Sequence, residues 1–123
     1  MLITRSIKAP IAIEDDLRIC IMRSVDQEKH PEYKPFDELW EELAPSNRLL
    51  KDYLNGLPWV DYVQRFTSEV LAWKQNVIIK LAKMALVQNV TILCVEPVPD
   101  TCHRRLVALA CKMYFPELEL KLE

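Results

Sequence analysis

The stretch that decides the fold is VTILCVEPVPDTCHRRLVALACKMY, residues 90–114. It opens with a short apolar run over residues 90–95, which is typical of a central strand covered on both faces. Two prolines then fix a rigid turn. The remaining residues, 101–114, predict a helix capped by Asp100 or Thr101, whose side-chain oxygens can accept hydrogen bonds from free backbone N–H groups.

Three further strands are expected on either side of this stretch. Residues 2–7 and 17–25 precede it and residues 117–122 follow it as an edge strand, while the polar residues 26–35 predict a surface loop. This order indicates one α/β domain over residues 1–123, with a small, mostly parallel sheet and helices on both faces. The link between the first two strands is short for a parallel crossover, so one antiparallel pair remains an alternative.

Helical spacing of apolar side chains also marks the middle of the chain. The segments are residues 36–43, 46–54, 58–70 and 75–87. Pro45 ends the first segment, and Ser46 is a suitable N-cap for the second. Gly56 ends the second segment, because glycine tolerates the left-handed conformation that follows many helices. Pro58 fits the first turn of the third segment, where a missing N–H costs nothing.

The last helix is expected to bury one stripe of side chains. At about 100° per residue, the inward stripe holds Leu106, Leu109, Ala110 and Met113. Cys102 lies one turn before this stripe and His103 at its border. The residues expected on the opposite, solvent-facing side are Arg104, Ala108 and Lys112. Leu93 and Leu109 are therefore predicted to be core residues.

The charge balance limits the classes of partner. Lys and Arg number 16 against 18 Asp and Glu, giving a formal net charge of −2. That balance gives no overall basic field for nucleic acid or an anionic membrane. The single glycine excludes a Gly-rich phosphate loop. Residues 1–13 lack the apolar core of a signal peptide, and no apolar run is as long as a membrane span. We therefore expect a cytoplasmic protein without a membrane association.

The cysteines are dispersed along the chain, at Cys20, Cys94, Cys102 and Cys111. Without an export signal, all four are expected to be reduced thiols with no disulfide. Their spacing also lacks the paired C-x2-C or H-x3-H arrangement of structural zinc sites. The sequence therefore predicts no metal and no cofactor.

A candidate site lies where the strands end, because ligands of open parallel sheets bind beyond the carboxyl ends of the strands. The strand at 90–95 brings Cys94 and Glu96 to that edge, and Arg23 reaches it if the strand at 17–25 runs parallel. Cys102 and His103 arrive with the start of the last helix. The free N–H groups and partial positive charge of a helix start stabilise an anion, which could be a ligand phosphate or a thiolate.

These residue types suggest roles in nucleophilic or anion-binding chemistry. Cys102 would be the nucleophile or an anion contact, and His103 a general acid or base. Arg23 would clamp an anionic small ligand, Glu96 would orient its neighbours, and Arg104 would add positive charge. The plainer alternative is that Cys102 only packs in a buried turn, so enzymatic activity stays an open question at this stage.

Several short motifs together resemble a known family. They are Leu93-Cys94-x-Glu96, Cys102-His103-Arg104, Leu43-Ala44-Pro45-Ser46, and Trp59 followed by Arg65-Phe66-x-x-Glu69. In this order and spacing, over roughly residues 2–114, they resemble the family called domain of unknown function 488. The resemblance implies a ligand-binding place for Arg5 and Arg23, which sit where that family tends to have strand arginines. After Arg23 that family often continues Leu-Trp-Pro-Arg-Gly, whereas this chain has an acidic-polar loop.

Two other functions remain as alternatives. The first is a non-catalytic interaction module, in which Trp40, Trp59 or Trp73 serves as an exposed anchor. The second is nucleic-acid binding through a basic helix face formed by Arg104, Arg105 and Lys112, although the net charge makes it the weaker alternative. The sequence also leaves open whether two copies of the chain form a homodimer.

Overall fold

A parallel sheet of five strands forms the centre of the protein. The computed structural model describes residues 1–123. The strands are β1 (Leu2–Ser6), β2 (Leu17–Cys20), β3 (Glu38–Leu39), β4 (Val90–Cys94) and β5 (Leu120–Leu122). Their order in the sheet is β3-β2-β4-β1-β5, and every neighbouring pair is parallel. The predicted α/β class is confirmed, and so are the central position of the 90–95 strand and the edge position of β5.

No antiparallel pair forms, because β1 and β2 are not neighbours in the sheet. β4 lies between them, with Leu2 of β1 and Leu17 of β2 both in register with Val90. The short link between β1 and β2 therefore crosses β4, which comes much later in the sequence. The strand predicted at 17–25 is shorter than expected and ends at Cys20.

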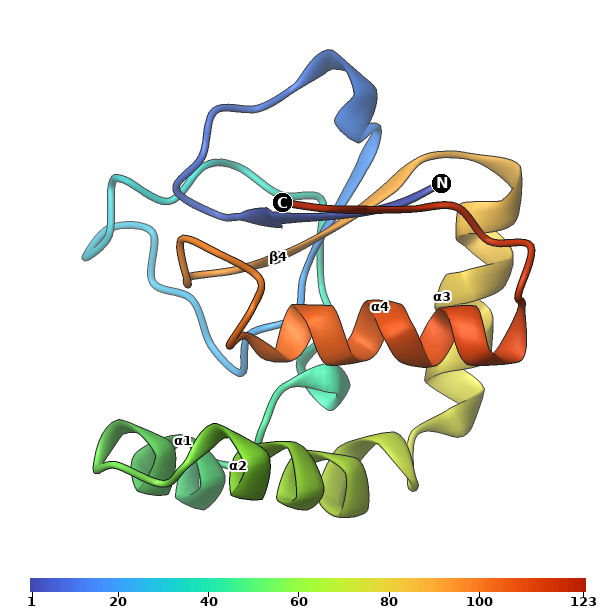
Figure 1. The fold of residues 1–123 in the computed structure, drawn as a ribbon. Coiled ribbons are helices and arrows are strands. Elements are labelled where there is room, and N and C mark those ends of the chain that lie inside the picture. Colours follow the sequence, from blue (N-terminus) through green and yellow to red (C-terminus); the bar gives the residue numbers. More distant parts are fainter.

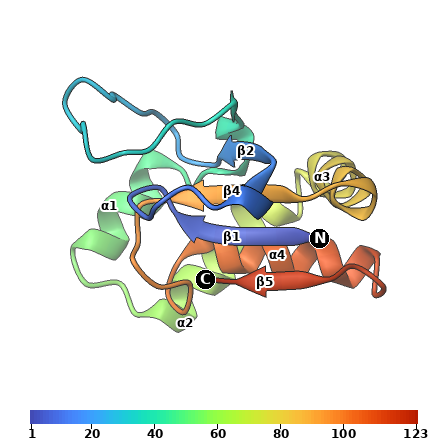
Figure 2. The ribbon, with the colours of Figure 1, turned by 90° about the horizontal axis from the view of Figure 1, so that it is seen from above.

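Four α-helices lie on one face of the sheet (Figures 1 and 2). They are α1 (Asn47–Leu54), α2 (Trp59–Phe66), α3 (Gln75–Val87) and α4 (His103–Tyr114). Right-handed crossovers place the connections from β3 to β4 and from β4 to β5 on this face, since both run in the same direction across the sheet. The connections that run the other way, through residues 7–16 and 21–37, cover the opposite face as loops and one 3-10 turn (Ile13–Asp15) instead of helices.

The helix predicted at 36–43 is wrong. Residues 38 and 39 form strand β3, and a 3-10 turn (Glu41–Leu43) follows it. This segment pairs with the edge of β2 instead, and two hydrogen bonds join Asp37 to Arg18 at the start of the pairing. The Arg18 backbone N–H donates to Asp37 Oδ2, and the Asp37 N–H donates to the Arg18 carbonyl, both at 2.8 Å. The other predicted helices are confirmed, with Ser46 as the N-cap of α1 and Gly56 at a φ of +109° after its end.

The buried face of α4 differs from the prediction. Leu109 is 37% exposed and Met113 83% exposed, so Leu109 is not a core residue, whereas Leu93 is fully buried as predicted. The buried residues of α4 are His103, Arg104, Val107, Ala108, Ala110 and Cys111. The spacing of Arg104, Val107, Ala108 and Cys111 is helical, and the small side chains among them let α4 approach β1 and β4 closely. The N-cap is Cys102, not Asp100 or Thr101, and its side chain makes no capping hydrogen bond.

Two apolar clusters fill the two sides of the sheet. The larger one joins Leu2, Ile19 and Ile92 to the helices. The smaller one joins Ile7, Cys20 and Leu93 beneath the loops of the opposite face. Alternate residues of β4 therefore enter different clusters, as expected for a central strand covered on both sides. No helix of this structure has both the length and the apolar character that crossing a bilayer requires.

Candidate functional site

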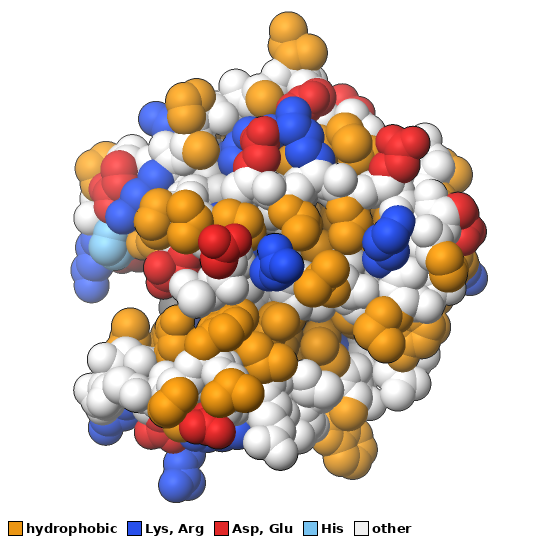
Figure 3. Space-filling view, in the orientation of Figure 1, with side chains coloured by type: hydrophobic (Ala, Val, Ile, Leu, Met, Phe, Trp, Pro, Cys, Tyr) orange, Lys and Arg blue, Asp and Glu red, His pale blue; other side chains and the backbone are white.

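A small cavity lies at the carboxyl ends of β2 and β4. Its volume is about 160 Å³, and its walls come from the residues after both strands, from the start of α4, and from α1 and α2. The connection after β2 leaves toward one face of the sheet and the connection after β4 toward the other, so the cavity occupies the point where the winding direction changes. Figure 3 shows the surface hollowed between the lower helices and the body of the sheet.

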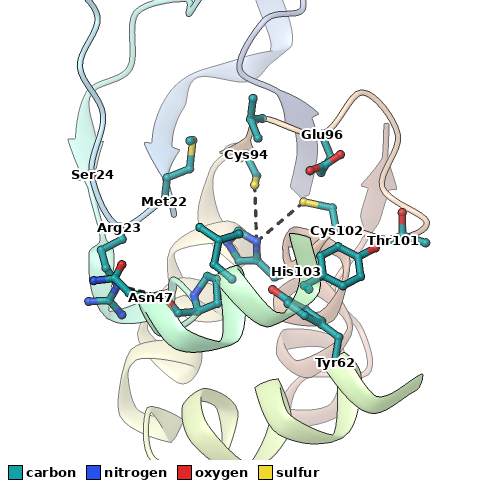
Figure 4. A pocket seen from close by; sticks show the side chains of 14 residues that line it. Met22, Arg23, Ser24, Asn47, Tyr62, Cys94, Glu96, Thr101, Cys102 and His103 are labelled. Carbon is teal, nitrogen blue, oxygen red and sulfur yellow. Dashed lines mark hydrogen bonds between the residues drawn. The ribbon is translucent and has the colours of Figure 1, made fainter. Parts of the chain in front are cut away.

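Three side chains with soft or nitrogen ligand atoms meet at the inner wall. The Nδ1 atom of His103 lies 3.5 Å from the Cys94 sulfur and 3.9 Å from the Cys102 sulfur. All three ligand atoms lie within 4.8 Å of one another, and the three residues are at most 6% exposed. In Figure 4 both sulfurs point toward the imidazole ring. We call these three residues the Cys-Cys-His cluster.

Local backbone geometry explains why Cys102 and His103 can meet although they are adjacent. Two consecutive residues inside a helix point in different directions. Cys102, however, is the N-cap, with extended dihedrals of φ −126° and ψ 143°. Its side chain therefore leaves the helical screw and turns back to the end of β4, where Cys94 is the last residue of the strand.

The imidazole of His103 is held at its far side. Its Nε2 atom lies 2.8 Å from the carbonyl oxygen of Ile21, a group that can only accept. Nε2 therefore carries the proton, and in the neutral ring Nδ1 presents a lone pair to the two sulfurs. The ring also lies against Phe66, with centroids 5.6 Å apart. His103 is thus a fixed acceptor at the cavity wall.

The pKa values of the two thiols in the cluster are shifted in opposite directions. The pKa of Cys94 is lowered by a hydrogen bond from the Cys102 thiol, which outweighs burial, and by the backbone N–H groups of Glu96 and Val95. The pKa of Cys102 is raised, first because its proton is shared with Cys94 and then because it is buried. The sequence pattern favours a lowered pKa at Cys102, whereas in the structure the pKa of Cys102 is raised and that of Cys94 is lowered.

The cavity wall also carries aromatic and charged groups. Tyr62 is 3% exposed, and its pKa is raised by burial and by the neighbouring Cys102 and Cys94 sulfurs, so the phenol stays protonated. Arg23 and Glu96 also line the cavity. The Nε atom of Arg23 donates to the carbonyl of Pro45 at 3.1 Å, which directs the guanidinium along the rim.

Five of the predicted site residues are therefore brought together. Arg23, Cys94, Glu96, Cys102 and His103 all line one cavity, and they come from the three segments named in the sequence argument. This juxtaposition concerns position, and the roles of these residues remain predictions. Sequence reasoning missed Tyr62, Tyr53 and Asn47, because the helical pattern marked the tyrosines only as core positions.

Two predicted ligand-binding arginines are not brought to the cavity. Arg5 pairs with Asp15 at 2.9 Å and with Glu123, away from the cluster. Arg104 is fully buried, and it donates to the carbonyls of Glu96 at 2.8 Å and Glu123 at 3.1 Å. Arg104 therefore links the turn after β4 to Glu123 through hydrogen bonds and does not line the cavity.

The burial of Arg104 also removes the basic helix face predicted as a nucleic-acid surface. Positive and negative side chains intermingle on the face seen in Figure 3. Of the three tryptophans, Trp40 is 8% exposed, Trp59 is half-buried against the core and Trp73 is 79% exposed, so Trp73 is the candidate surface anchor. All four cysteines are free thiols, and Cys111 lies apart from the cluster, donating to the Ile78 carbonyl at 3.6 Å.

A comparison with family models gives a match over residues 2–112 to the model described as the active DUF488-N3 subclade. The match contains β1 to β4, the turn after β4 and nearly all of α4. Neither the comparison with curated proteins nor that with solved structures gave a match. The family resemblance seen in the short motifs is thereby confirmed, and the chain belongs to the DUF488 family.

Proposed function

We propose that this protein is a thiol-dependent enzyme that acts on a small molecule with an electrophilic carbon, and that Cys94 is its nucleophile. The observation that supports this most strongly is the lone pair of His103 Nδ1, aimed at the Cys94 sulfur from 3.5 Å at the wall of a cavity. A nucleophile, an adjacent base and a group that orients the base form the arrangement common to covalent catalysis. Here the orienting group is the Ile21 carbonyl.

The cavity limits the size of the substrate. A dry cavity of about 150 Å³ accommodates a benzene molecule, so about 160 Å³ suits a ligand or reacting group of that size. At the rim, Arg23 is well placed to contact an anionic end of the ligand. The proposed substrate is therefore a small molecule with an electrophilic carbon and an anionic end.

The proposed reaction begins with attack by the Cys94 sulfur on the electrophilic carbon, forming a sulfur–carbon bond. The thiol proton passes to Nδ1 of His103. The other ring nitrogen, Nε2, already donates a hydrogen bond to the Ile21 carbonyl. The imidazolium then returns that proton to the leaving group as its bond to carbon breaks. The protonated phenol of Tyr62 can donate to an oxygen on which negative charge develops.

The test is the rate of alkylation at each cysteine, measured by iodoacetamide labelling and peptide mass spectrometry on the reduced, chelator-treated full chain. We expect Cys94 to react faster in the folded protein than in the urea-unfolded chain, and faster than Cys102 and Cys111. His103→Gln should slow Cys94 labelling, because the base at 3.5 Å is lost.

Cys111→Ser is the matched control, since that thiol is buried but lies outside the cluster. It should leave the labelling rate of Cys94 unchanged. Labelling of Cys94 that is no faster in the folded than in the unfolded chain would overturn the proposal.

A further inference from the structure

The Cys-Cys-His cluster has the donor set of a soft metal centre. Two sulfurs and one imidazole nitrogen are ligands that Zn²⁺ prefers, whereas Mg²⁺ and Ca²⁺ prefer oxygen. We propose that Cys94, Cys102 and His103 bind one Zn²⁺ ion per chain, with a fourth coordination position open to the cavity. This inference does not rest on the proposed thiol chemistry. It concerns the metal-bound form of the cluster, whereas the thiol chemistry concerns the metal-free form.

The distances fit tetrahedral coordination. With Zn–S bonds of about 2.3 Å and a Zn–N bond of about 2.05 Å, a tetrahedral centre separates sulfur from nitrogen by about 3.5 Å and sulfur from sulfur by about 3.8 Å. The observed sulfur–nitrogen distances are 3.5 Å for Cys94 and 3.9 Å for Cys102. An ion could therefore be accommodated with shifts of a few tenths of an ångström at these pairs.

The outer partner of His103 is a second, independent observation. Histidines that bind metals almost always donate their other ring N–H to a carbonyl or a carboxylate, which fixes the tautomer and the orientation of the ring. Nε2 of His103 does this with the Ile21 carbonyl at 2.8 Å. Nδ1, the atom left to bind the ion, is the one that faces both sulfurs (Figure 4).

Charge also favours an ion at this buried place. Two thiolates and one Zn²⁺ ion form a centre with no net charge, so its burial avoids the cost of an isolated ion. The cluster borders the cavity, which provides space for water or a substrate atom in the fourth position. Three protein ligands and one open position are typical of catalytic zinc sites, whereas structural sites are closed by four protein ligands.

Occupation by Zn²⁺ would use the lone pairs that the thiol reaction needs. The Cys94 sulfur and His103 Nδ1 would both be bound to the ion, so neither could act as nucleophile or base. The metal-bound protein should therefore be slow to alkylate at Cys94, and a chelator should restore labelling. The site thus allows zinc to inhibit the proposed thiol chemistry reversibly.

The experiment is a titration of the reduced, metal-free full chain with Co²⁺, followed by its visible and near-ultraviolet absorption. Tetrahedral cobalt with thiolate ligands should give intense visible bands and sulfur-to-cobalt charge-transfer bands, saturating at one ion per chain. Zn²⁺ should then displace Co²⁺ and abolish these bands. Absence of these bands in the folded wild-type chain would overturn the proposal, whatever the variants do.

The variants Cys94→Ser, Cys102→Ser and His103→Ala should each weaken Co²⁺ binding by more than about 100-fold, because loss of an outer partner alone costs about 10–100-fold. Circular dichroism verifies that each variant is folded. Cys20→Ser, at a buried thiol outside the cluster, should bind as the wild type does. Unchanged binding by a folded Cys94→Ser chain would also overturn the proposed site.

The two proposals can fail separately. Fast labelling of Cys94 without cobalt bands supports only the thiol enzyme. Cobalt bands without fast labelling of the metal-free chain support only the zinc site.

Discussion

The backbone carbonyl of Ile21 accepts a hydrogen bond from Nε2 of His103 at 2.8 Å, across 82 positions of sequence. This bond joins the residue after β2 to the first residue of α4, and so links both sides of the place where the winding direction of the sheet changes. It also determines which ring nitrogen faces the sulfurs. Nucleophilic catalysis and zinc binding both depend on that orientation.

The first prediction concerns the tautomer of His103. In the metal-free protein, at a pH where the ring is neutral, the proton should reside on Nε2 because that atom faces a carbonyl. Two-dimensional ¹⁵N NMR that correlates the ring nitrogens with the carbon-bound ring protons should show a protonated Nε2 and an unprotonated Nδ1. The opposite tautomer would remove the acceptor from both sulfurs and contradict both proposals.

The second prediction separates the two thiols. A hydrogen bond from Cys102 stabilises negative charge on Cys94. Cys102→Ala removes this donor and should slow alkylation of Cys94 in the chelator-treated protein. Cys102→Ser keeps a hydroxyl donor at the same position and should retain most of the rate. A Cys102→Ala rate equal to that of the wild type would show that Cys102 does not activate Cys94.

The third prediction compares two leucines on the neighbouring helices α3 and α4. Leu81 of α3 is fully buried, whereas Leu109 of α4 is 37% exposed. Leu81→Ala should cost about 2–5 kcal/mol of unfolding free energy, as is usual for core leucines. Leu109→Ala should cost about 1 kcal/mol or less, since part of its surface is already in water. Urea denaturation of both variants measures the difference, and a larger loss for Leu109 would contradict the orientation of α4.

Leu109 also shows where prediction from the sequence reached its limit. The 90–95 strand and the helix after it were predicted correctly, because apolar runs and prolines are local signals. The buried face of α4 was not, because the pattern favoured large apolar residues over Arg104 and Ala108. The buried Arg104 guanidinium donates to the carbonyls of Glu96 and Glu123, and these contacts form only in the folded chain, so the helical pattern does not mark them.

The same limit applies to the candidate site. Sequence reasoning placed Arg23, Cys94, Glu96, Cys102 and His103 at one edge, because the carboxyl ends of parallel strands converge. It did not predict the Cys-Cys-His cluster, because the spacing of Cys94, Cys102 and His103 lacks the paired arrangement of known zinc motifs. The extended N-cap at Cys102 and the Ile21 carbonyl create that cluster, and neither has a signature in the residue pattern.

A buried ion network near the end of β1 leads to the last prediction. Asp15 is 1% exposed and pairs with Arg5 and with Arg18, which are also largely buried. Burial raises the pKa of Asp15, but the backbone N–H of Ala12 and the Arg5 guanidinium outweigh it, so the net shift is downward. Asp15 therefore pairs with two positive charges on the sheet face that the loops cover.

Asp15→Asn should destabilise the protein by about 3–5 kcal/mol at neutral pH, because it leaves two buried guanidinium groups without their shared carboxylate. A carboxyl group whose pKa is lowered on folding contributes stability that is full above its unfolded pKa of about 3.9. That contribution is lost as the pH falls through the lower folded pKa. The gap in urea midpoint between wild type and variant should accordingly be widest near neutrality and narrow below about pH 4. Asp52→Asn is the matched control, since that carboxylate pairs with Arg65 near the surface and outside this network, so its loss should leave the midpoint nearly unchanged. A gap that stays constant across this pH range would show that the charge of Asp15 does not stabilise the fold.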